Sequence, residues 1–509
     1  MNANNRHTFD IVVIGSGLGG LVSALLLAKS GKSVAVLEKN NQFGGNLQTF
    51  ARDKKIIDTG VHYVGGLSKG ENLYQYFSYL DILPDLKWER LNNDAFDKIY
   101  FNEKGQYYPQ AQGYENFVNQ LLVLFPEEKE ALEKYIKTIQ TYCDAFPMYR
   151  LDFENKYQSA FLEPSVQEVM DSITSNETLK AVLLGNNFLY ALDYQNTPFY
   201  VHALTVNSYI ESSWRCVKGG SQITKALVKQ LKKHKVQLFK YQEVKTFITD
   251  ENRIVSCETE TDSFRAETFI SNIDLKTTYG FLPENFQKKP SIKRVKSLKV
   301  TPSVFSVHIV LKEQTIPYFN HNIYHYDCLN EVKNYHNPVD ENFPKQMVIT
   351  TNPVCENQKF ADVITIMTYM DFEAFSRWTA SKSTVKKPQN RGEDYEAFKR
   401  DLAEKIIEKA SIHFPSLREN MLRYYTSTPL TYRDYIGSEN GTLYGFEKTA
   451  HRSHLTQIFP QTKIPNLFLT GQNVRMHGIL GVTVSAFHLV KEFLGDKTFN
   501  DLLELSRNK

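Results

Sequence analysis

A glycine-rich turn between an apolar strand and an apolar helix constrains this chain more than any other feature. Residues 11–14 are a short β-branched run, which predicts the first strand of a parallel sheet. A helix is expected over residues 18–30, where leucine and alanine recur at helical spacing before Gly31. The turn allows a tight bend, a close approach of backbone to ligand and close packing of helix on strand. Its residues are Gly15, Gly17, Leu18, Gly19 and Gly20.

An acidic residue stands where a nucleotide-binding turn needs one. Residues 34–37 predict the second strand, and Glu38 follows it about 20 residues after the glycines. A carboxylate there accepts hydrogen bonds from both ribose hydroxyls and repels a 2′-phosphate, while the helix N-terminus favours a diphosphate. The alternative is a glycine-rich turn in an unrelated sheet, which would not explain why an acidic residue stands at position 38. We therefore predict a Rossmann-type dinucleotide site that disfavours NADP and also includes Lys39, Gly44, Gly45 and Asn46.

Composition excludes several classes of protein. The 509 residues suffice for two or three domains, and the 13% of aromatic residues must line a core, a pocket or a membrane-facing surface. A formal charge of +3 is too balanced to indicate nucleic-acid binding. Five scattered cysteines lack metal-ligand spacing, so we expect a reducing compartment, no disulfide framework and no metal site. No apolar run reaches bilayer length and no secretory leader is seen, which predicts a cytoplasmic protein and leaves a peripheral membrane contact open.

A second glycine-rich segment lies near the end of the chain. Residues 464–471 predict a strand that ends at a glycine, and an apolar helix is expected from about residue 481 to 494. Such a helix, aimed at a cofactor, favours developing negative charge by roughly 0.5 to 2 kcal/mol. A plain strand–turn–helix without a ligand is the alternative. The residues assigned to the cofactor site here are Gly471, Gly478, Gly481, Val482 and Thr483.

The cofactor domain is therefore predicted to be discontinuous. Its middle piece is expected to hold a helix over 222–233 after Gly219 and Gly220, and it contributes Val244 to the cofactor site. Short alternating runs predict its strands, near residues 236–239, 243–248, 254–258 and 268–272.

Two inserts between these pieces are predicted to form a substrate domain. The first is mostly helical, with periodic apolar residues from 117 to 142, and the second mixes strands over 304–311 and 363–370 with a helix over 395–413. The fold class is α/β, a discontinuous Rossmann-type cofactor-binding domain with a mixed α+β substrate-binding domain. The expected boundaries are 1–70, 215–290 and 440–509 for the first domain, and 71–214 and 291–439 for the second.

Several motifs give this chain a family resemblance that spans nearly its whole length. Residues 57–65, Ile-Asp-Thr-Gly-Val-His-Tyr-Val-Gly, are the most selective of them. On these motifs the chain resembles the FAD-dependent carotenoid desaturases and isomerases, and most closely their retinol-saturase-like branch. One departure is the absence of a proline from residues 214–218, before the double glycine. The other motifs are Gly219-Gly220, residues 270–272, 428–431, 441–445, 469–471 and 478–486.

The resemblance implies a flavin amine oxidase or phytoene desaturase type of fold that binds FAD. It also implies a hydrophobic polyene or isoprenoid lipid as substrate, with saturation, desaturation and isomerisation all open. Because the last cysteine, Cys355, lies well before Gly471, we expect FAD to be held without a covalent bond. No second glycine fingerprint marks a nicotinamide site, so the sequence leaves the electron donor or acceptor unidentified.

His62 and Tyr63 are the catalytic candidates. Saturation of a double bond delivers a hydride to one carbon and a proton to the other, and either side chain could give that proton. The alternative is structural: Tyr63 packs against the flavin and His62 is hydrogen-bonded in the core. The pair favours a saturase-like reaction.

Two other functions fit the same kind of sequence. One is an amine oxidase, and the other is a non-catalytic prenyl-binding protein of this architecture. The lysine-rich residues 288–299 are a solvated face or a contact for an acidic carrier or a lipid headgroup. The apolar clusters near 117–125 and 188–200 are buried core, a lipid tunnel or a membrane contact.

Overall fold

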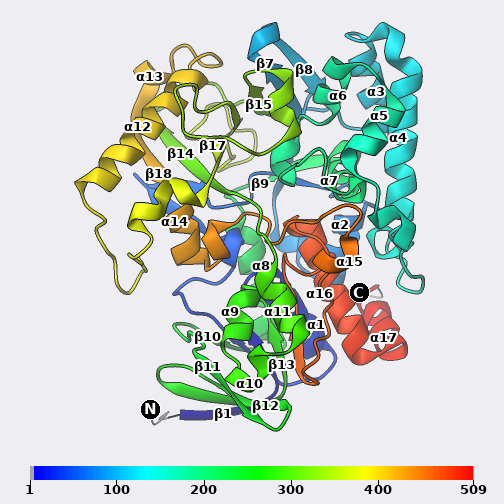
Figure 1. The fold of residues 1–509 in the computed structure, drawn as a ribbon, viewed down its shortest axis with the longest axis vertical. Coiled ribbons are helices and arrows are strands. Elements are labelled where there is room, and N and C mark those ends of the chain that lie inside the picture. The colour runs from blue at the N-terminus through cyan, green and yellow to red at the C-terminus, as the bar shows by residue number, and fades with distance from the viewer. Residues whose placement is uncertain (1–4, 508–509) are drawn as a thin grey trace.

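Two large sheets organise the chain in the computed structural model, which describes residues 5–507 (Figure 1). The first sheet takes strands from the beginning, the middle and the end of the sequence, and its strand order is β10-β2-β1-β13-β12-β11, with β19 beside β13. β1, β2, β10, β13 and β19 run parallel, and β12 pairs antiparallel with both β13 and β11. The bounds are β1 (Asn5–Ile14), β2 (Val34–Leu37), β10 (Gln237–Phe239), β11 (Thr246–Asp250), β12 (Arg253–Glu258), β13 (Asp262–Ser271) and β19 (Leu467–Leu469).

The predicted strand–helix–strand unit is confirmed. Residues Ile11 to Ile14 pair in register with Val34 to Leu37, and α1 (Leu18–Lys29) connects the two strands. Every residue of α1 except Lys29 is buried, because α8 (Ser221–Lys233) and α16 (Gly478–Leu494) pack beside it on one face of the sheet. α9 (Leu275–Gly280), α10 (Glu284–Gln287) and α11 (Pro290–Ser297) cover the other face.

The second sheet joins both inserts, in the order β18-β14-β17-β16-β15-β7-β8. β7 and β8 come from the first insert, whose prediction as mostly helical missed them. These strands are too short for periodicity to reveal, and Gly105, at φ +59°, turns the chain between them. The domain boundaries given above remain a prediction. The bounds are β7 (Asp97–Phe101), β8 (Gln106–Gln110), β14 (Ser303–Leu311), β15 (Asn322–Tyr326), β16 (Gln346–Thr350), β17 (Val363–Met370) and β18 (Met421–Ser427).

Helices of the first insert cover one end of the second sheet, at the upper right of Figure 1. The apolar run from residue 117 to 142 forms two helices, because Pro126 cannot continue the first one. The helix expected over 395–413 is α12, which ends at Ala410. The remaining helices of the first insert are α2 (Asn72–Tyr79), α3 (Tyr114–Leu122), α4 (Lys129–Asp144), α5 (Val166–Ile173), α6 (Glu177–Leu183) and α7 (Phe199–Glu211), and α12 spans Glu393–Ala410.

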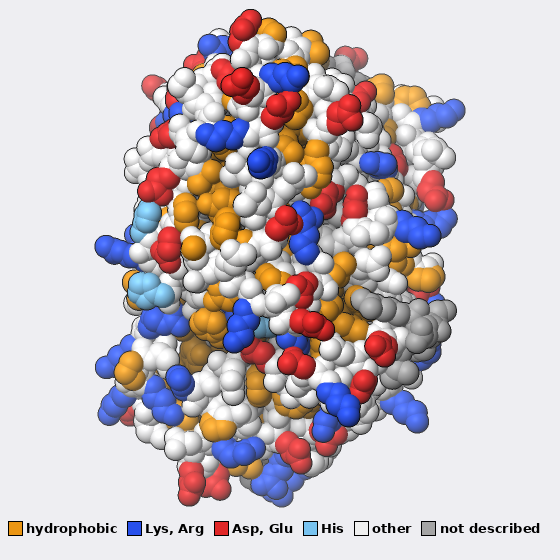
Figure 2. All heavy atoms as spheres, turned by 90° about the vertical axis from the view of Figure 1, so that its right-hand side faces the viewer, with side chains coloured by type: hydrophobic (Ala, Val, Ile, Leu, Met, Phe, Trp, Pro, Cys, Tyr) orange, Lys and Arg blue, Asp and Glu red, His pale blue; other side chains and the backbone are white. Residues whose placement is uncertain are grey.

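A small third sheet connects the two larger ones. In it β9 (Ser213–Cys216) pairs with β5 (Val64–Gly65) and with β6 (Trp88–Arg90). Over most of the face in Figure 2, basic and acidic side chains are interspersed, with basic ones gathered toward the lower left edge. None of the helices described is both long and apolar enough to cross a bilayer.

Candidate functional site

The glycine turn has the geometry of a nucleotide cradle. Gly15 has a φ of +93°, a left-handed conformation that favours glycine, and its N–H donates to the Leu37 carbonyl at 2.8 Å. The Gly44 N–H donates to the Ser16 carbonyl at 3.0 Å, and Gly44 bridges to Gly17. The structure therefore brings the predicted residues 15–20 and 44–46 together at the N-terminus of α1, where backbone N–H groups suit a diphosphate.

The two ends of the chain meet at this turn. A Cβ atom on Gly19 would lie 2.9 Å from the Gly471 nitrogen and 2.7 Å from Asn272 Oδ1. The Asn272 N–H donates to the Ile14 carbonyl at 2.8 Å, so the middle piece reaches the same point. Thr470 Oγ1 is buried there without a hydrogen-bond partner among residues 5–507. This orphaned hydroxyl and the glycine-lined space fit a bound dinucleotide.

Glu38 is fixed at the end of β2. One carboxylate oxygen accepts from the Ser16 N–H at 3.2 Å and from its hydroxyl, and the other accepts from the Asn40 N–H at 2.9 Å. Val244 is buried in the same core cluster as Leu37, two residues after Gln242, whose N–H donates to the Glu38 carbonyl at 2.8 Å. Glu38 and Val244 therefore both lie near the end of β2, where the ribose of a dinucleotide is expected.

Lys39 forms a hydrogen bond with the second insert. Its Nζ donates to the Asp434 carbonyl at 3.3 Å, within the π-helical turn Tyr432–Ile436 of the second insert. Burial lowers the pKa of Lys39, and the nearby Glu38 carboxylate opposes that effect. Its ammonium thus contacts the junction between the two predicted domains.

The N-terminus of α16 forms the other side of the space. Gly478 begins the helix and is exposed, and Gly481 is half-buried. Val482 and Thr483 are buried in the helix packing, and the Thr483 hydroxyl donates to the Ile479 carbonyl at 2.7 Å. The Thr483 hydroxyl is therefore already satisfied within the helix. His477 caps the start of the helix, and its Nε2 lies 3.0 Å from the Leu189 carbonyl.

His62 and Tyr63 have opposite environments. Both ring nitrogens of His62 are buried without a hydrogen-bond partner in the described part of the chain. Burial, with help from the Arg215 cation, lowers the pKa of His62 to about 4, so the imidazole is neutral near pH 7. The Tyr63 hydroxyl instead donates to Asp97 Oδ2 at 2.7 Å and contacts the Tyr324 hydroxyl.

Asp97 is a site residue that the sequence did not reveal. It is fully buried on β7 and also accepts from Asn322 Nδ2 at 2.7 Å and from Asn186 Nδ2. Burial raises the pKa of Asp97 to about 7, although its three hydrogen-bond donors oppose the shift. This carboxyl group can therefore hold or release a proton near neutral pH.

Arg215 was missed as well. It is fully buried on β9, within the segment where the family's proline is absent. Its guanidinium donates to the Phe319 carbonyl at 2.9 Å, to the His321 carbonyl at 2.7 Å and to Asn322 Oδ1 at 2.8 Å, and among the described residues no carboxylate forms an ion pair with it. Asn322 thus bridges the guanidinium to Asp97.

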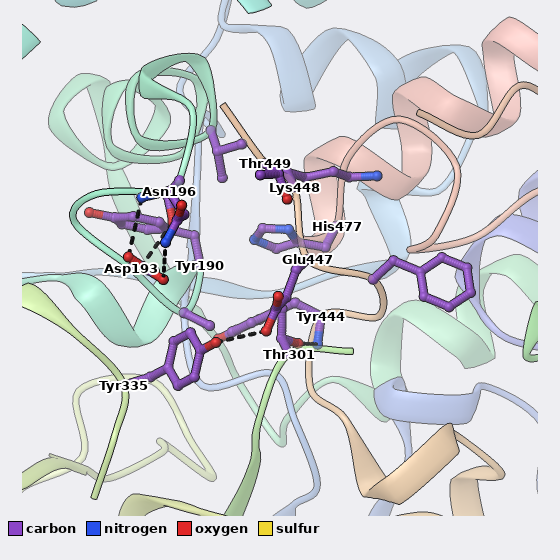
Figure 3. A pocket seen from close by; sticks show the side chains of 14 residues that line it. Tyr190, Asp193, Asn196, Thr301, Tyr335, Tyr444, Glu447, Lys448, Thr449 and His477 are labelled. Carbon is purple, nitrogen blue, oxygen red and sulfur yellow. Dashed lines mark hydrogen bonds between the residues drawn. The ribbon is translucent and has the colours of Figure 1, made fainter. Parts of the chain in front are cut away.

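A cavity with about 30 Å³ of free volume, room for ordered water, opens between the first insert and the end of the chain (Figure 3). The Tyr335 hydroxyl donates to Glu447 Oε1 at 2.7 Å, and the Tyr444 ring lies 4.5 Å from that of His477. Among the residues that line the cavity, only Tyr444 belongs to a segment that carries the family resemblance. The polar side chains that line it include Tyr190, Asp193, Tyr335, Tyr444, Glu447 and His477.

A Rossmann-type nucleotide site closed by both ends of the chain, beside a mixed second sheet, defines a class of flavin-dependent oxidoreductases. Residues 18–387 match the family of flavin containing amine oxidoreductases, and the chain belongs to that family. Its cofactor is FAD, as predicted. When bound, FAD supplies the two-electron redox chemistry, and the glycine turn, Glu38 and the α16 N-terminus are the groups placed to hold it.

Individual proteins resemble the chain over nearly its whole length. All-trans-retinol 13,14-reductase of Danio rerio is 26% identical over 94% of this chain and 84% of its own. The chloroplastic prolycopene isomerase of Arabidopsis thaliana is 23% identical over 91% of this chain and 79% of its own. An oxidoreductase of Methanosarcina mazei shares the fold, with a TM-score of 0.63 and 14% identity over 94% of this chain and 99% of that one. The predicted fold class and family resemblance are confirmed.

Proposed function

We propose that this protein is an FAD-dependent oxidoreductase that acts on carbon–carbon double bonds of a polyene or isoprenoid lipid, and that its reaction is saturase-like. The observation that carries the proposal is the near full-length similarity to a retinol 13,14-reductase, with a prolycopene isomerase also related. Both names describe chemistry at conjugated double bonds. The aromatic first insert supports an apolar substrate, because its rings form much of the core around the cavity.

Tyr63 is the proposed proton donor, and Asp97 is the proposed proton store behind it. The 2.7 Å hydrogen bond joins the phenol to a carboxyl group whose pKa is about 7. When the phenol gives up its proton, a protonated Asp97 can return one along this bond. The reaction is therefore expected to be fastest below about pH 7, where Asp97 is protonated, and to slow as pH rises through that pKa.

His62 is proposed to contact the substrate or the cofactor as a neutral hydrogen-bonding group. With a pKa of about 4 it carries no proton to donate as imidazolium near pH 7. Its two unpartnered nitrogens fit a group that is satisfied only when a ligand is bound. The predicted catalytic pair thus has divided roles.

One experiment tests the reaction. The purified protein is expected to be yellow. It is incubated anaerobically with a panel of retinoids, carotenoids and unsaturated fatty acids, in one series after reduction with dithionite and in a parallel series with the oxidised flavin, which can accept the two electrons of a single desaturation. A product heavier by two hydrogens supports saturation, a lighter one desaturation, and an unchanged mass with a new retention time isomerisation. A colourless protein that FAD cannot reconstitute, or one that changes no polyene, contradicts the proposal.

The second candidate is an amine oxidase. The observation that favours it is the cavity, which is lined by three tyrosines and Glu447, the groups that could bind an ammonium ion. Hydrogen peroxide released from simple amines in air, together with no reaction of polyenes, would assign the protein to this function.

A further inference from the structure

Two segments that are far apart in the sequence and contain no acidic residues lie side by side on the surface. There is no aspartate or glutamate between Glu284 and Glu313, nor between Glu447 and Glu492. The two segments touch, because Arg294 Nη1 on α11 donates to the Leu455 carbonyl and, at 3.2 Å, to the Gln457 carbonyl. Each segment alone is an ordinary loop or helix, but together they concentrate positive charge on one side of the molecule.

α11 presents its charge outward. Ile292 and Val295 are buried against the first sheet, whereas Lys293 and Lys296 are exposed on the opposite side of the helix. Lys299 follows them, also exposed, and its carbonyl accepts from the Glu447 N–H at 3.0 Å. Residues 288–299 hold six lysines and arginines in all, so the predicted lysine-rich run is a coherent basic face.

Apolar side chains project from the same surface. Leu455 on α15 (Ser453–Thr456) is 41% exposed, and Phe459 just after this helix is 47% exposed. Arg475 stacks over the Phe459 ring at 4.6 Å, which holds the ring beside another cation. Large apolar side chains among basic ones are typical of a surface that enters the headgroup region of a bilayer.

The surface adjoins the cavity. Residues 445–449 lie beside the segment that comes after α11, because the Thr301 N–H donates to the Gly445 carbonyl at 2.8 Å. Within this stretch, Lys448 and Thr449 line the cavity. Lys448 Nζ is buried without a hydrogen-bond partner among the described residues. Burial and the nearby Arg475 and Arg294 cations lower the pKa of Lys448 to about 8, so an anion beside it would be stabilised.

The acidic residues at the margin do not neutralise this surface. Glu163 accepts from the Ser453 hydroxyl and Glu168 lies 3.1 Å from His451, so two carboxylates lie beside α15. Glu447 accepts from Tyr335, Glu492 lies 3.1 Å from His488, and Glu284 lies 3.9 Å from Lys288. Within residues 5–507, none of these carboxylates forms an ion pair with Lys293, Lys296, Lys299 or Arg452.

We propose that this surface docks the protein on an anionic lipid bilayer, with Leu455 and Phe459 inserted among the headgroups and the cavity opening toward the membrane. The defining residues are Lys293, Lys296, Lys299, Arg452, Leu455 and Phe459. Docking would bring an apolar substrate from the bilayer to the site without passage through water, and this consequence rests on the proposed function. The binding of lipid by this surface does not depend on the proposed function.

Vesicle sedimentation of the FAD-loaded protein, without any substrate, tests the proposal. Vesicles of phosphatidylcholine alone are compared with vesicles that contain about 30% phosphatidylserine, at low and high salt. Binding is expected to the anionic vesicles only and to weaken with salt. Each basic residue at the surface contributes roughly fivefold to partitioning, so the K293E/K296E variant is expected to bind at least about 25-fold more weakly.

A matched control reverses two charges elsewhere. Lys232 and Lys233 are exposed at the end of α8, which covers the opposite face of the first sheet, so K232E/K233E is expected to bind vesicles like the parent protein. The L455S/F459S variant keeps every charge and is expected to bind more weakly by loss of insertion. Melting temperature and flavin absorbance are measured for each variant to confirm that it is folded.

Three results would overturn the proposal. The first is that the protein does not bind anionic vesicles. The second is that the K232E/K233E control loses as much binding as K293E/K296E. The third is that L455S/F459S binds vesicles as well as the parent protein and that poly-L-glutamate displaces it from them. The last result would assign the surface to an acidic macromolecule instead. Because no substrate is present, none of these results bears on the double-bond chemistry, which the polyene assay tests separately.

Discussion

Replacing Tyr63 with phenylalanine separates a chemical role of this residue from a structural one. The change removes a single hydroxyl and leaves the ring, which packs 4.7 Å from that of Tyr209. The lost hydroxyl is one of three donors to the buried Asp97. A hydrogen bond to a charged group contributes about 1.5 to 3 kcal/mol, so the free energy of unfolding is expected to fall by about that amount when Asp97 is ionised.

The effect on turnover is expected to be much larger than the effect on stability. A positioned proton donor contributes roughly 100- to 10,000-fold to the rate, so Y63F should lose that factor in the rate of alkene reduction. FAD affinity is expected to be unchanged, because the lost hydroxyl bonds to Asp97 and Tyr324 and the ring stays in place. The pKa of Asp97 should rise further, since the bond from Tyr63 lowers it.

The assay is single-turnover reduction of the polyene that the panel identifies, measured with prereduced enzyme over a range of pH. The Y209F variant is the control, because it deletes the same atom from the neighbouring ring and leaves the bond to Asp97 intact. If Y63F keeps full turnover while its stability falls, Tyr63 only packs and the reasoning is refuted.

Three further predictions concern Asp97, Glu38 and Gly19. The parent rate is expected to fall as pH rises through about 7 because Asp97 loses its proton, and D97N should be slower with this limb absent; an unchanged pH profile would contradict the relay. E38Q removes the charge expected at the ribose, so FAD should bind roughly 10- to 100-fold more weakly in a fluorescence titration, and an unchanged Kd would place the ribose elsewhere. G19A puts a Cβ within 2.9 Å of three atoms and should destabilise the protein by about 1 to 3 kcal/mol in chemical denaturation, whereas G280A, which meets no atom within 4 Å, should not; equal losses would show that the ends are not packed as described.

The parts of the fold that are determined by residues close together in the sequence could be predicted. The first strand, α1 and β2 follow from a local alternation of apolar runs and glycines, and Glu38 lies at a fixed offset from them. The C-terminal strand and α16 have the same kind of local pattern. The family resemblance and the FAD cofactor follow from these segments together with the motif at residues 57–65.

The polar network behind Tyr63 could not be predicted in this way. Asp97 lies 34 residues from Tyr63 and 225 residues from Asn322, and nothing near any of them marks a contact. β7, which carries Asp97, is short and contains aromatic residues, so the spacing of its apolar residues fits a strand and a helix equally well. Arg215 follows a tryptophan in a segment where the resemblance weakens. Such contacts exist only once both large sheets are assembled.

Arg215 is coupled electrostatically to both His62 and Asp97, and it is linked to the same region by strand pairing and hydrogen bonds. β9, which carries it, pairs with β5, which directly follows Tyr63, while its guanidinium binds the segment that ends at Asn322. The same cation lowers the pKa of His62 and opposes the rise in the pKa of Asp97. Burial is the larger cause in both cases, and it sets the two pKa values apart because it lowers that of the imidazole and raises that of the carboxyl group. Two groups whose environments separate their pKa values in this way can bind and protonate separately.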